Sequence, residues 1–291
     1  MIPIQLEGKA AFVTGVADDG GFGWTIAKTL QAAGARVFLG SHPRTVGIVE
    51  RLLRRPQSAA DRALPFGAQG ELSPEAIIPC DVAYDQLTDI PEETRAQKGY
   101  READASVAGA FKALAEKLGS TPLSILIHAV AFSPEIDRSH LDTSRAAYLT
   151  AMSVSSYSLV ALTRAALPMM VNGSIIGLSY LAANKVVPGY GGGMSAAKAA
   201  LECDARMLAH FVGGRGHRVN IVSPGPFPSR AARSIGDIDA MIEHVKERSP
   251  LKKTIDAMDV ASLVAFLASP LAGSITGELI HVDAGYHVMA G

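Results

Sequence analysis

Short apolar runs alternate with longer segments of helical periodicity along nearly the whole chain. The apolar runs carry few polar residues, which is typical of parallel strands that are buried on both faces. The expected strands are Ala10–Gly15, Arg36–Gly40, Ala76–Cys80, Ser124–Ala129, Ser174–Ser179, Arg218–Ser223 and Leu279–Asp283. Helical patterns occupy most of the gaps, for example Trp24–Ala33, Val107–Leu118, Ser195–Phe211 and Met258–Ala268.

This alternation predicts an α/β fold: a three-layer, Rossmann-type, doubly wound parallel sheet of about seven strands. No linker, low-complexity tract or internal repeat divides the chain, so we expect residues 1–291 to form a single domain. Two connections are longer than such a fold needs. They are Ser41–Glu71, which holds the basic run RLLRRPQ, and the charge-rich Ala83–Ala105. Each is either a functional or oligomer-related loop or a simple surface insertion.

Composition narrows the classes of function. Hydrophobic residues make up 48% of the chain and charged residues 19%, which suits a well-buried core. A formal net charge of −1 argues against nucleic acid or an anionic membrane as the main partner. Only Cys80 and Cys203 occur, far apart, which favours a reducing intracellular compartment. The uncharged segment Ala146–Thr163 contains five serine and threonine residues before its end, so burial in the core or in a subunit interface explains it better than a membrane.

A glycine-rich stretch, GVADDGGFGW, follows the first expected strand and opens the first expected helix. Gly15, Gly21 and Gly23 fit a turn whose backbone approaches a pyrophosphate at a helix N-terminus. The stretch is longer than GxGxxG, and the alternative is a merely tight strand-to-helix turn. Its position directly between a strand and a helix favours the dinucleotide site.

The second expected strand ends in GSHPR, without the acid that usually binds the adenosine ribose about twenty residues after the glycine-rich turn. Arg44 is either a partner for a 2′-phosphate, which would favour NADPH, or a solvated loop residue. Asp81 and Val82 follow the third strand and are placed to border the adenine ring. Asp81 could equally cap the turn that follows it.

The most specific stretch is LSYLAANKVVPGYGGGMSAAKAALE, which holds Tyr180, Tyr190 and Lys198. It resembles the enoyl-acyl-carrier-protein reductases of the short-chain dehydrogenase/reductase superfamily, and more narrowly their plant, chlamydial and apicomplexan branch. GVADDGGFGWTIAK, LDTSRAAYL, SRAARSIG and SPLAGSITGELIHVDAG extend the resemblance over nearly the whole chain. Most of the superfamily uses Tyr-x3-Lys, whereas here seven residues separate Tyr190 from Lys198.

The resemblance implies hydride transfer from a nicotinamide to the β-carbon of a trans-2-enoyl thioester. Tyr190 would donate a hydrogen bond to the thioester oxygen, where negative charge develops. Lys198 would bind the nicotinamide ribose, favour the enolate and lower the pKa of the nearby phenol. Tyr180 would line the acyl pocket, or would simply be a packed aromatic residue. The glycines after Tyr190 leave little side chain to pack, so we expect this backbone to be shaped for the approach of another group.

The resemblance also implies the residues that line each part of the site. NADH is the expected cofactor, and NADPH is left open by Arg44. The expected cofactor-binding residues are Gly15, Gly21, Phe22, Gly23, Trp24, His42, Asp81, Val82, Ala129, Val130, Ala131, Leu178, Lys198, Ser223, Pro224, Gly225, Pro226 and Ser229. The expected substrate-binding residues are Phe132, Tyr180, Tyr190, Met194, Phe227, Ala231 and Ile235, with a substrate lid over about 224–248.

Two stretches depart from the family pattern. In HAVAFSPE, Ala129 replaces a serine, which puts one cofactor hydrogen bond in doubt but not the fold. In SPGPFPSRAA, the added Pro224 and Pro228 would stiffen the lid. Arg230 and Arg233 on that lid are either docking residues for an acidic carrier protein or solvated charges. The histidines form no ligand cluster, so we expect no metal site.

These observations lead to one expectation and two alternatives. We expect an NADH-dependent enoyl-acyl-carrier-protein reductase of fatty acid elongation, acting on acyl carrier protein that bears a trans-2-enoyl group. The family also implies a homotetramer, with Ala146–Leu162 and Ser195–Phe211 as interface helices. A cytoplasmic location is expected, or a plastid stroma if the chain is processed. The alternatives are another short-chain reductase acting on a ketone or enone, and a catalytically silent nucleotide-binding scaffold.

Overall fold

The computed structural model describes residues 4–55, 59–229 and 238–290. Seven parallel strands form one sheet in the order β3-β2-β1-β4-β5-β6-β7. The strands are β1 Ala10–Thr14, β2 Arg36–Ser41, β3 Ala76–Pro79, β4 Leu123–His128, β5 Met170–Leu178, β6 Arg218–Pro224 and β7 Leu279–Val282. All seven predicted strands are therefore confirmed. The largest difference is β5, which begins four residues earlier than expected because Met170 pairs with Leu123.

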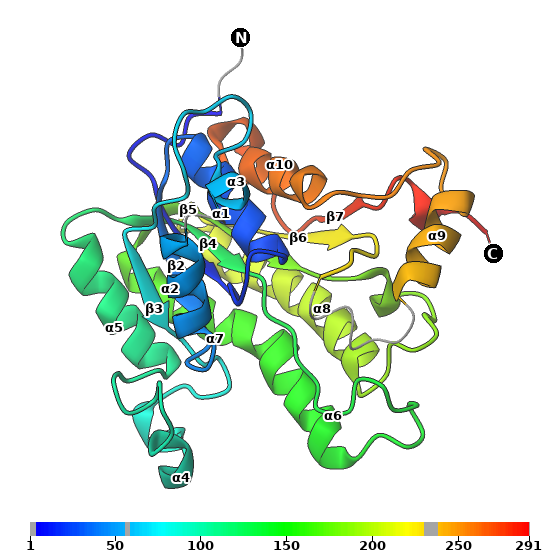
Figure 1. Ribbon diagram of the computed structural model, residues 1–291, viewed down its shortest axis with the longest axis horizontal. Helices are drawn as coiled ribbons and strands as arrows, with labels where there is room; N and C mark the ends of the chain where they lie inside the picture. Colours follow the sequence, from blue (N-terminus) through cyan, green and yellow to red (C-terminus); the bar gives the residue numbers. More distant parts are fainter. Residues whose placement is uncertain (1–3, 56–58, 230–237, 291) are drawn as a thin grey trace.

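Helices cover both faces of the sheet, as a doubly wound fold requires (Figure 1). One face carries α1 (Phe22–Ala32), α2 (Val46–Arg54) and α10 (Ala257–Ala268). The other carries α5 (Val107–Leu118), α7 (Ser158–Ala166) and α8 (Met194–Gly213). Three more helices are α3 Ala59–Arg62, α4 Glu92–Arg95 and α9 Ile238–Arg248, and α6 Arg145–Met152 precedes α7. The four helices that the sequence indicated are present, with ends within two residues of expectation.

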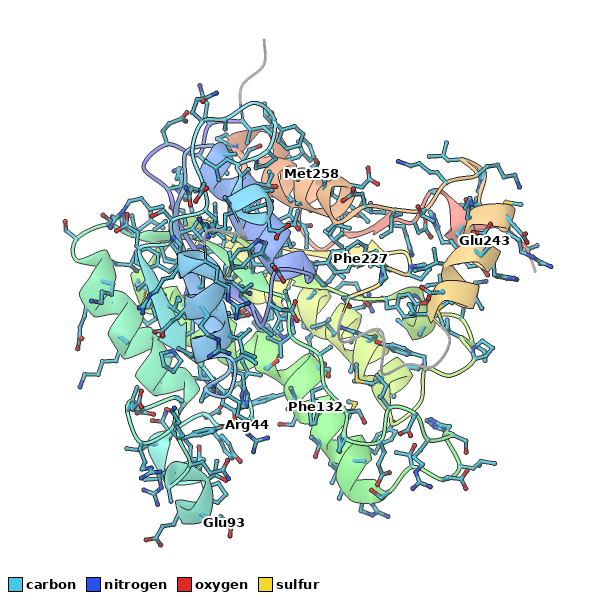
Figure 2. All side chains as sticks on the ribbon, viewed as in Figure 1. Arg44, Glu93, Phe132, Phe227, Glu243 and Met258 are labelled. Carbon is cyan, nitrogen blue, oxygen red and sulfur yellow. The ribbon has the colours of Figure 1, made fainter. Side chains whose placement is uncertain are left out.

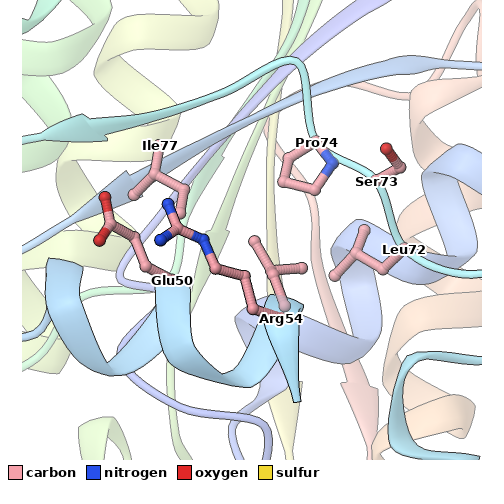
Figure 3. A pocket seen from close by; sticks show the side chains of 7 residues that line it. Glu50, Arg54, Leu72, Ser73, Pro74 and Ile77 are labelled. Atoms are coloured by element: carbon pink, nitrogen blue, oxygen red, sulfur yellow. The ribbon is translucent and has the colours of Figure 1, made fainter. Parts of the chain in front are cut away.

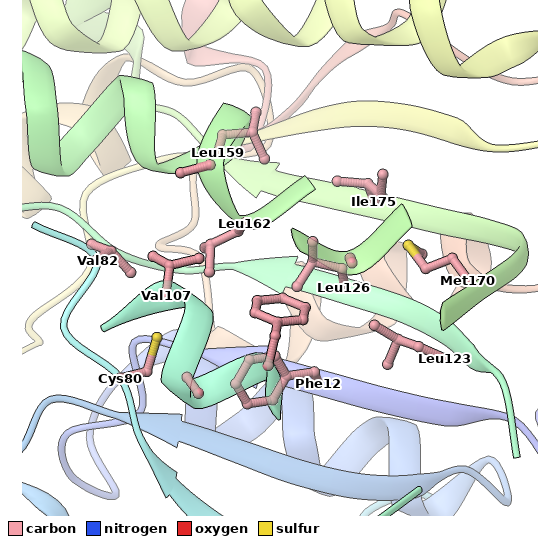
Figure 4. Close-up of a cluster of buried hydrophobic side chains, with 14 of the residues drawn as sticks. Phe12, Cys80, Val82, Val107, Leu123, Leu126, Leu159, Leu162, Met170 and Ile175 are labelled. Carbon is pink, nitrogen blue, oxygen red and sulfur yellow. The ribbon is translucent and has the colours of Figure 1, made fainter. Parts of the chain in front are cut away.

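Alternate residues of each strand pack into two separate hydrophobic cores, because successive side chains of a strand point to opposite faces of the sheet. On β1, Phe12 packs toward α5, where its ring meets Phe111 edge-on at 5.5 Å between centroids. Its neighbours Ala11 and Val13 face α1 and α10. Figure 4 shows the first of these cores, in which Val82 and Val107 lie together near the carboxyl ends of the strands.

The two long connections contain secondary structure of their own. Ser41–Glu71 contains α2 and α3, and its half-exposed Glu71 binds the buried Arg62 at 2.7 Å. Ala83–Ala105 contains a short 3-10 turn and α4, and it extends from the lower end of the molecule as drawn in Figure 1. Ile90, Tyr100 and Ala105 give it a small apolar core of its own. Neither connection is an unstructured loop.

The apolar segment Ala146–Thr163 is not one regular helix, and part of it is exposed in the single chain. A π-helical turn, Ser153–Tyr157, separates α6 from α7. Leu149 and Tyr157 are exposed, whereas Ser155, Ser156 and Ser158 point inward and make hydrogen bonds. Among the described residues, only 145–169 is long and apolar enough to span a membrane, and 56% of its apolar window is buried in the protein. Packing in the core of the protein explains the burial of this apolar segment without a membrane.

A surface hollow of about 320 Å³ lies between α2 and the segment that leads into β3 (Figure 3). Its walls are Glu50, Leu53, Arg54, Leu72, Ser73, Pro74 and Ile77. None of these residues belongs to the predicted cofactor or substrate site. The hollow lies at the β3 edge of the sheet, whereas the predicted catalytic residues follow β5. The predicted functional residues therefore lie at the strand ends and not in this hollow.

Candidate active site

The strand order reverses between β1 and β4, which places a crevice beyond the carboxyl ends of these two strands. Gly15 leaves β1 with a φ of +79°, and a Cβ atom there would lie 2.2 Å from the Ala129 carbonyl oxygen after β4. Only glycine permits this approach. The two predicted cofactor segments, around Gly15 and Ala129–Ala131, are thus brought together at the switch point.

The N-terminus of α1 suits an anion. Gly21 caps the helix without any side-chain hydrogen bond to its first N–H groups, and no acidic residue lies in the first turn. The first N–H groups of a helix have no intrahelical partners, so they are available to a pyrophosphate. Gly23 packs against Val16, which lets the helix approach the strand. The side chain of Trp24 is buried and donates to the Asp61 carbonyl at 3.2 Å, so it points away from the anion site.

Asp81 follows β3 and is held by three donors. Its Oδ1 accepts from the Ala83 N–H at 3.0 Å, and its Oδ2 accepts from the Tyr100 hydroxyl at 2.6 Å. Burial alone would raise the pKa of Asp81, but hydrogen bonds from His42, Tyr100 and the Ala83 N–H bring that pKa below its usual value. The turn-capping role that the sequence left open is present. Val82 packs its side chain into the core, so only its backbone can border a ligand.

Arg44 is exposed beside this cluster, and its Nη2 donates to Gln97 at 3.2 Å (Figure 2). Its backbone N–H donates to Nδ1 of His42 at 3.2 Å. The described structure therefore gives Arg44 a partner within the chain, from the connection that follows Asp81. A solvated position accounts for these contacts without a 2′-phosphate.

Lys198 lies on the second turn of α8 and is buried. Its Nζ donates to the Leu178 carbonyl at the end of β5, at 2.7 Å. Burial lowers the pKa of Lys198 to about 8, and Glu202 opposes that shift. His128, at the end of β4, is buried as well, and its Nε2 lies 2.7 Å from Ser158 Oγ. Burial and the charge of Lys198 lower the pKa of His128 to about 3, so this imidazole is neutral.

The rings of Tyr180 and Tyr190 lie together, 5.0 Å apart between centroids. Tyr180 follows β5 directly, and its hydroxyl lies 3.1 Å from the Met241 sulfur on α9. Burial raises the pKa of Tyr180 to about 12. Burial and the neighbouring Tyr180 also raise the pKa of Tyr190. In the free protein, burial and Tyr180 thus raise the pKa of this phenol overall, and the lowering by Lys198 stays a prediction.

The glycine run after Tyr190 makes room for the chain itself. A Cβ on Gly191 would collide with the Arg138 carbonyl, and one on Gly192 would lie 2.4 Å from Ser133 Oγ. A Cβ on Gly193 would lie 2.9 Å from the ring of Tyr148 in α6. Ser133 Oγ also donates to the Gly192 carbonyl at 2.7 Å. The segment after β4, with Tyr148 of α6, is thus the group that approaches this backbone on the side where a Cβ would stand.

The remaining predicted residues lie where β4 and β6 end. Ser223, Pro224, Gly225 and Pro226 are buried, and Gly225 packs on Asp283 after β7. The Phe227 ring lies 4.9 Å from that of Phe22, which joins the β6 end to the first turn of α1. Ala131 and Phe132 are exposed, Val130 and Ser229 are half-buried, and Met194 is buried against Tyr190. Figure 2 shows Phe132 and Phe227 on these two separate segments. Ala231, Ile235, Arg230 and Arg233 lie outside the described residues.

Sequence reasoning missed the residues that hold these segments in place. Ser155, in the π-helical turn, accepts from the Phe132 N–H at 2.9 Å and so fixes the backbone after β4. Glu202 accepts from Ser179 at 2.6 Å and from Asn184 at 3.2 Å, which ties α8 to the loop that carries both tyrosines. The only signal in the sequence was polarity inside apolar segments. Among the described residues, no three His, Cys, Asp or Glu side chains gather as metal ligands would.

A doubly wound sheet, an open helix N-terminus at the switch point, a buried lysine bound to the end of β5 and a tyrosine pair that follows β5 fit a nucleotide-dependent oxidoreductase. Comparison with known proteins makes this class narrower. The model of the enoyl-(acyl carrier protein) reductase family matches residues 80–287. The chloroplastic, NADH-dependent enoyl-acyl-carrier-protein reductase of Arabidopsis thaliana is 45% identical over 99% of this chain and 74% of its own. The chain belongs to the enoyl-acyl-carrier-protein reductase family.

Solved structures support the same assignment. The enoyl-acyl-carrier-protein reductase of Plasmodium berghei, in a complex with triclosan, superposes with a TM-score of 0.91 at 38% identity, over 97% of this chain and 99% of that one. The enzyme of Anaplasma phagocytophilum, in complex with NAD, gives a TM-score of 0.79 at 34% identity, over 100% and 98% of the two chains. The predicted likeness to the plant and apicomplexan branch is confirmed.

Proposed function

We propose that Tyr190 and Lys198 perform in this chain the reaction of its family, the NADH-dependent reduction of a trans-2-enoyl thioester carried by acyl carrier protein. The observation that carries this proposal is the position of Tyr190. Its ring lies 5.0 Å from Tyr180, and Tyr180 is two residues beyond the Leu178 carbonyl that binds Lys198. The phenol pair and the ammonium group are therefore both tied to the end of β5, through Tyr180 and Leu178.

Tyr190 acts as a hydrogen-bond donor rather than as a phenolate. Burial raises its pKa, so the hydroxyl keeps its proton across the physiological range. A neutral phenol stabilises the oxygen of the thioester as that oxygen gains negative charge, because the hydrogen bond strengthens with the charge on the acceptor. When bound, NADH supplies the hydride that the β-carbon receives.

Lys198 holds the nicotinamide ribose and places a positive charge near the reacting thioester. Its hydrogen bond to the Leu178 carbonyl fixes the amine at the end of β5 and leaves two N–H donors for the ribose hydroxyls. Burial keeps the surrounding dielectric constant low, which strengthens the attraction of this charge for the enolate oxygen. Tyr180, with its hydroxyl at Met241, shapes the acyl side of the pocket.

The adenosine and pyrophosphate end of the cofactor fits residues at the switch point between β1 and β4. The uncapped N-terminus of α1 receives the pyrophosphate, and His42 and Asp81 border the adenosine. The N-terminal glycine turn and the segment Ala129–Ala131 lie on either side of the dinucleotide, since their close approach brings both to the crevice. Of the substrate lid expected over about 224–248, residues 230–237 lie outside the described part of the chain, and α9 is its described helix.

The oligomer and the location follow the family. The chain forms a homotetramer, in which the exposed Leu149, Tyr157, Met207 and Phe211 of the α6–α8 surface are covered by a second copy. A monomer in light scattering would contradict this assembly. The enzyme acts in the cytoplasm, or in a plastid stroma when the chain is a processed form, since the plant relatives are named chloroplastic. Fractionation of the source cells would separate these two locations.

The reaction is tested by the absorbance of the reduced nicotinamide on mixing NADH, a trans-2-enoyl thioester and the protein. Wild type should consume NADH only with the thioester, and Tyr190→Phe should lose most of that rate. Parallel assays with NADPH measure the cofactor preference. Binding of NADH without turnover would instead support the silent scaffold, and turnover of a ketone in place of the enoyl thioester would support another reductase.

A further inference from the structure

The connection between β3 and α5, residues 84–105, folds back over the turn that follows β2. Gly99 lies against Pro43 in that turn, so closely that a Cβ on Gly99 would be 2.6 Å from the Pro43 carbonyl oxygen. Its φ of +94° is one that glycine adopts without strain. The segment is anchored at its own end as well, because the Ala105 carbonyl accepts from the Asp81 N–H at 2.7 Å.

Tyr100 connects this segment to both residues at the adenosine end. It is buried, its hydroxyl donates to Asp81 Oδ2 at 2.6 Å, and its oxygen lies 3.2 Å from Nε2 of His42. The tautomer of the neutral His42 ring follows from the hydrogen bond at its other nitrogen, Nδ1. Nδ1 accepts from the Arg44 N–H, so the proton of the neutral ring is on Nε2 and points at Tyr100. The hydrogen bonds run from His42 to Tyr100 and from Tyr100 to Asp81, and His42 Nε2 also lies 3.4 Å from Asp81 Oδ2.

This chain of hydrogen bonds fixes two orientations at once. The imidazole of His42 stands edge-on to the Tyr100 ring, at 83° between planes and 6.0 Å between centroids. The Asp81 carboxylate has one oxygen bound to the Ala83 N–H and the other to Tyr100. Without the Tyr100 hydroxyl, the carboxylate loses a charge-assisted donor, and the His42 ring keeps only its longer contact with Asp81 Oδ2, at 3.4 Å. Both groups would then sample rotamers that do not fit a flat, hydrogen-bonding base.

We infer that residues 84–105 preset the adenosine end of the cofactor site, and that Tyr100 is the positioning residue that holds His42 and Asp81 ready for an adenine nucleotide. The inference rests on the proposed function, in which these two residues border the adenosine. It assigns a binding role to a connection that the fold itself does not require. The segment acts on the cofactor and not on the acyl substrate, since its contacts are with the ends of β2 and β3.

The test is a fluorescence titration of NADH, with ADP-ribose as a competitor that lacks the nicotinamide. Tyr100→Phe should raise the Kd for both ligands about five- to tenfold, because one charge-assisted and one neutral hydrogen bond are lost. Gly99→Ala should raise them similarly by pushing the segment away from Pro43. KM for the enoyl thioester and kcat at saturating NADH should stay within about twofold of wild type, a split that general loss of structure would not produce.

Two control variants match these changes. Tyr84→Phe removes a hydroxyl from the same small core, one with no hydrogen bond among the described residues. Gly70→Ala has almost the same φ, +97°, but no atom within 4 Å of its Cβ position. Both should bind NADH like wild type. Unchanged Kd values in Tyr100→Phe and Gly99→Ala would overturn the inference, as would an equal rise in the KM for the thioester.

The titration tests the role of Tyr100 separately from the proposed reaction, because NADH binding needs no turnover. Wild type that binds NADH but reduces no enoyl thioester would overturn the proposed function and leave the effect of Tyr100 measurable. Wild type that fails to bind either ligand would overturn both. Turnover with no effect of Tyr100 would overturn this inference alone.

Discussion

The rings of Tyr180 and Tyr190 lie 5.0 Å apart between centroids at an angle of 54°, and the hydroxyl of Tyr180 is directed at the sulfur of Met241. The sequence places two phenols before one lysine, and this geometry separates their roles. The Tyr180 hydroxyl contacts a thioether, which is a weak acceptor, and so it points at the wall of the pocket and not at the substrate. Tyr190, whose hydroxyl makes no hydrogen bond among the described residues, is the phenol free to donate to a substrate.

The two tyrosines should therefore respond differently to loss of the hydroxyl. Tyr190→Phe should lower kcat about 100-fold or more, the loss typical of one donor to a developing oxyanion. Tyr180→Phe should lower kcat less than about tenfold, because the ring remains packed on Tyr190 and only a weak contact is removed. Steady-state rates of NADH consumption with an enoyl thioester measure both. Equal losses would mean that the two hydroxyls share the oxyanion.

Lys198 should give the enzyme a pH dependence near 8. Burial lowers its pKa from 10.5 to about 8, so the ammonium form predominates below pH 8 and is lost as the pH rises through that value. KM for NADH should rise above pH 8 in wild type, since the neutral amine binds the ribose less well. Lys198→Arg should lose this inflection, because guanidinium stays charged. An inflection that persists in Lys198→Arg would assign it to another group.

The lowered pKa of Lys198 should also make the stability of the protein increase with pH. The folded pKa of Lys198 lies below the unfolded one, so the unfolded chain binds more protons between pH 8 and 10.5. The free energy of unfolding of wild type should therefore rise across this interval relative to Lys198→Met, in which the penalty for a buried charge is absent. Urea denaturation at several pH values would measure the difference. A constant difference would show that the pKa of the buried amine is close to its unfolded value, and a falling one that pairing holds this pKa above the unfolded value.

The strands could be predicted from the sequence because buried parallel strands are apolar on both faces, and that pattern depends on no distant partner. The glycine run at 191–193 was different. A glycine in the sequence indicates only that another group approaches its backbone closely. That group can be a ligand or another part of the chain, and the sequence does not distinguish the two. In the structure it is the segment 133–138, together with Tyr148 of α6, that approaches.

Ser155 and Tyr100 were missed for a related reason. Each acts through a hydrogen bond to a residue far away in sequence, Ser155 to Phe132 and Tyr100 to His42 and Asp81. A π-helical turn adds a residue to a helix without changing its apolar composition, so periodicity cannot indicate which serine turns inward. Contacts of this kind become visible only when the strand order has placed the segments side by side.

The glycine run offers a test of stability that is independent of catalysis. Gly192 has a φ of +59°, and a Cβ there would lie 2.4 Å from Ser133 Oγ and 2.5 Å from the Glu135 carbonyl oxygen. Gly192→Ala should lower the free energy of unfolding by about 2–4 kcal/mol, through backbone strain and collision. Gly214→Ala is the matched control, with a φ of −62° and open space around its Cβ position.

Gly214→Ala should change stability by less than about 1 kcal/mol, in the stabilising direction, because alanine restricts the unfolded chain more than glycine does. Thermal or urea denaturation compares the two variants. Similar stabilities for Gly192→Ala and Gly214→Ala would mean that the segment 133–138 moves aside without cost, and the packing described for the glycine run would then be of little consequence.

Ser155 should affect both stability and cofactor binding, since it lies under the backbone that borders the cofactor. Its Oγ accepts from the Phe132 N–H at 2.9 Å and donates to the Phe132 carbonyl at 3.2 Å. Ser155→Ala would leave both groups without that partner, at a cost of about 1–3 kcal/mol in the free energy of unfolding. The segment Ala129–Phe132 would then lose its fixed position, and KM for NADH should rise. Ser153→Ala, on the same turn and without a side-chain hydrogen bond among the described residues, should leave both quantities near wild type. A loss of stability with no change in KM would place the effect of Ser155 in the fold alone.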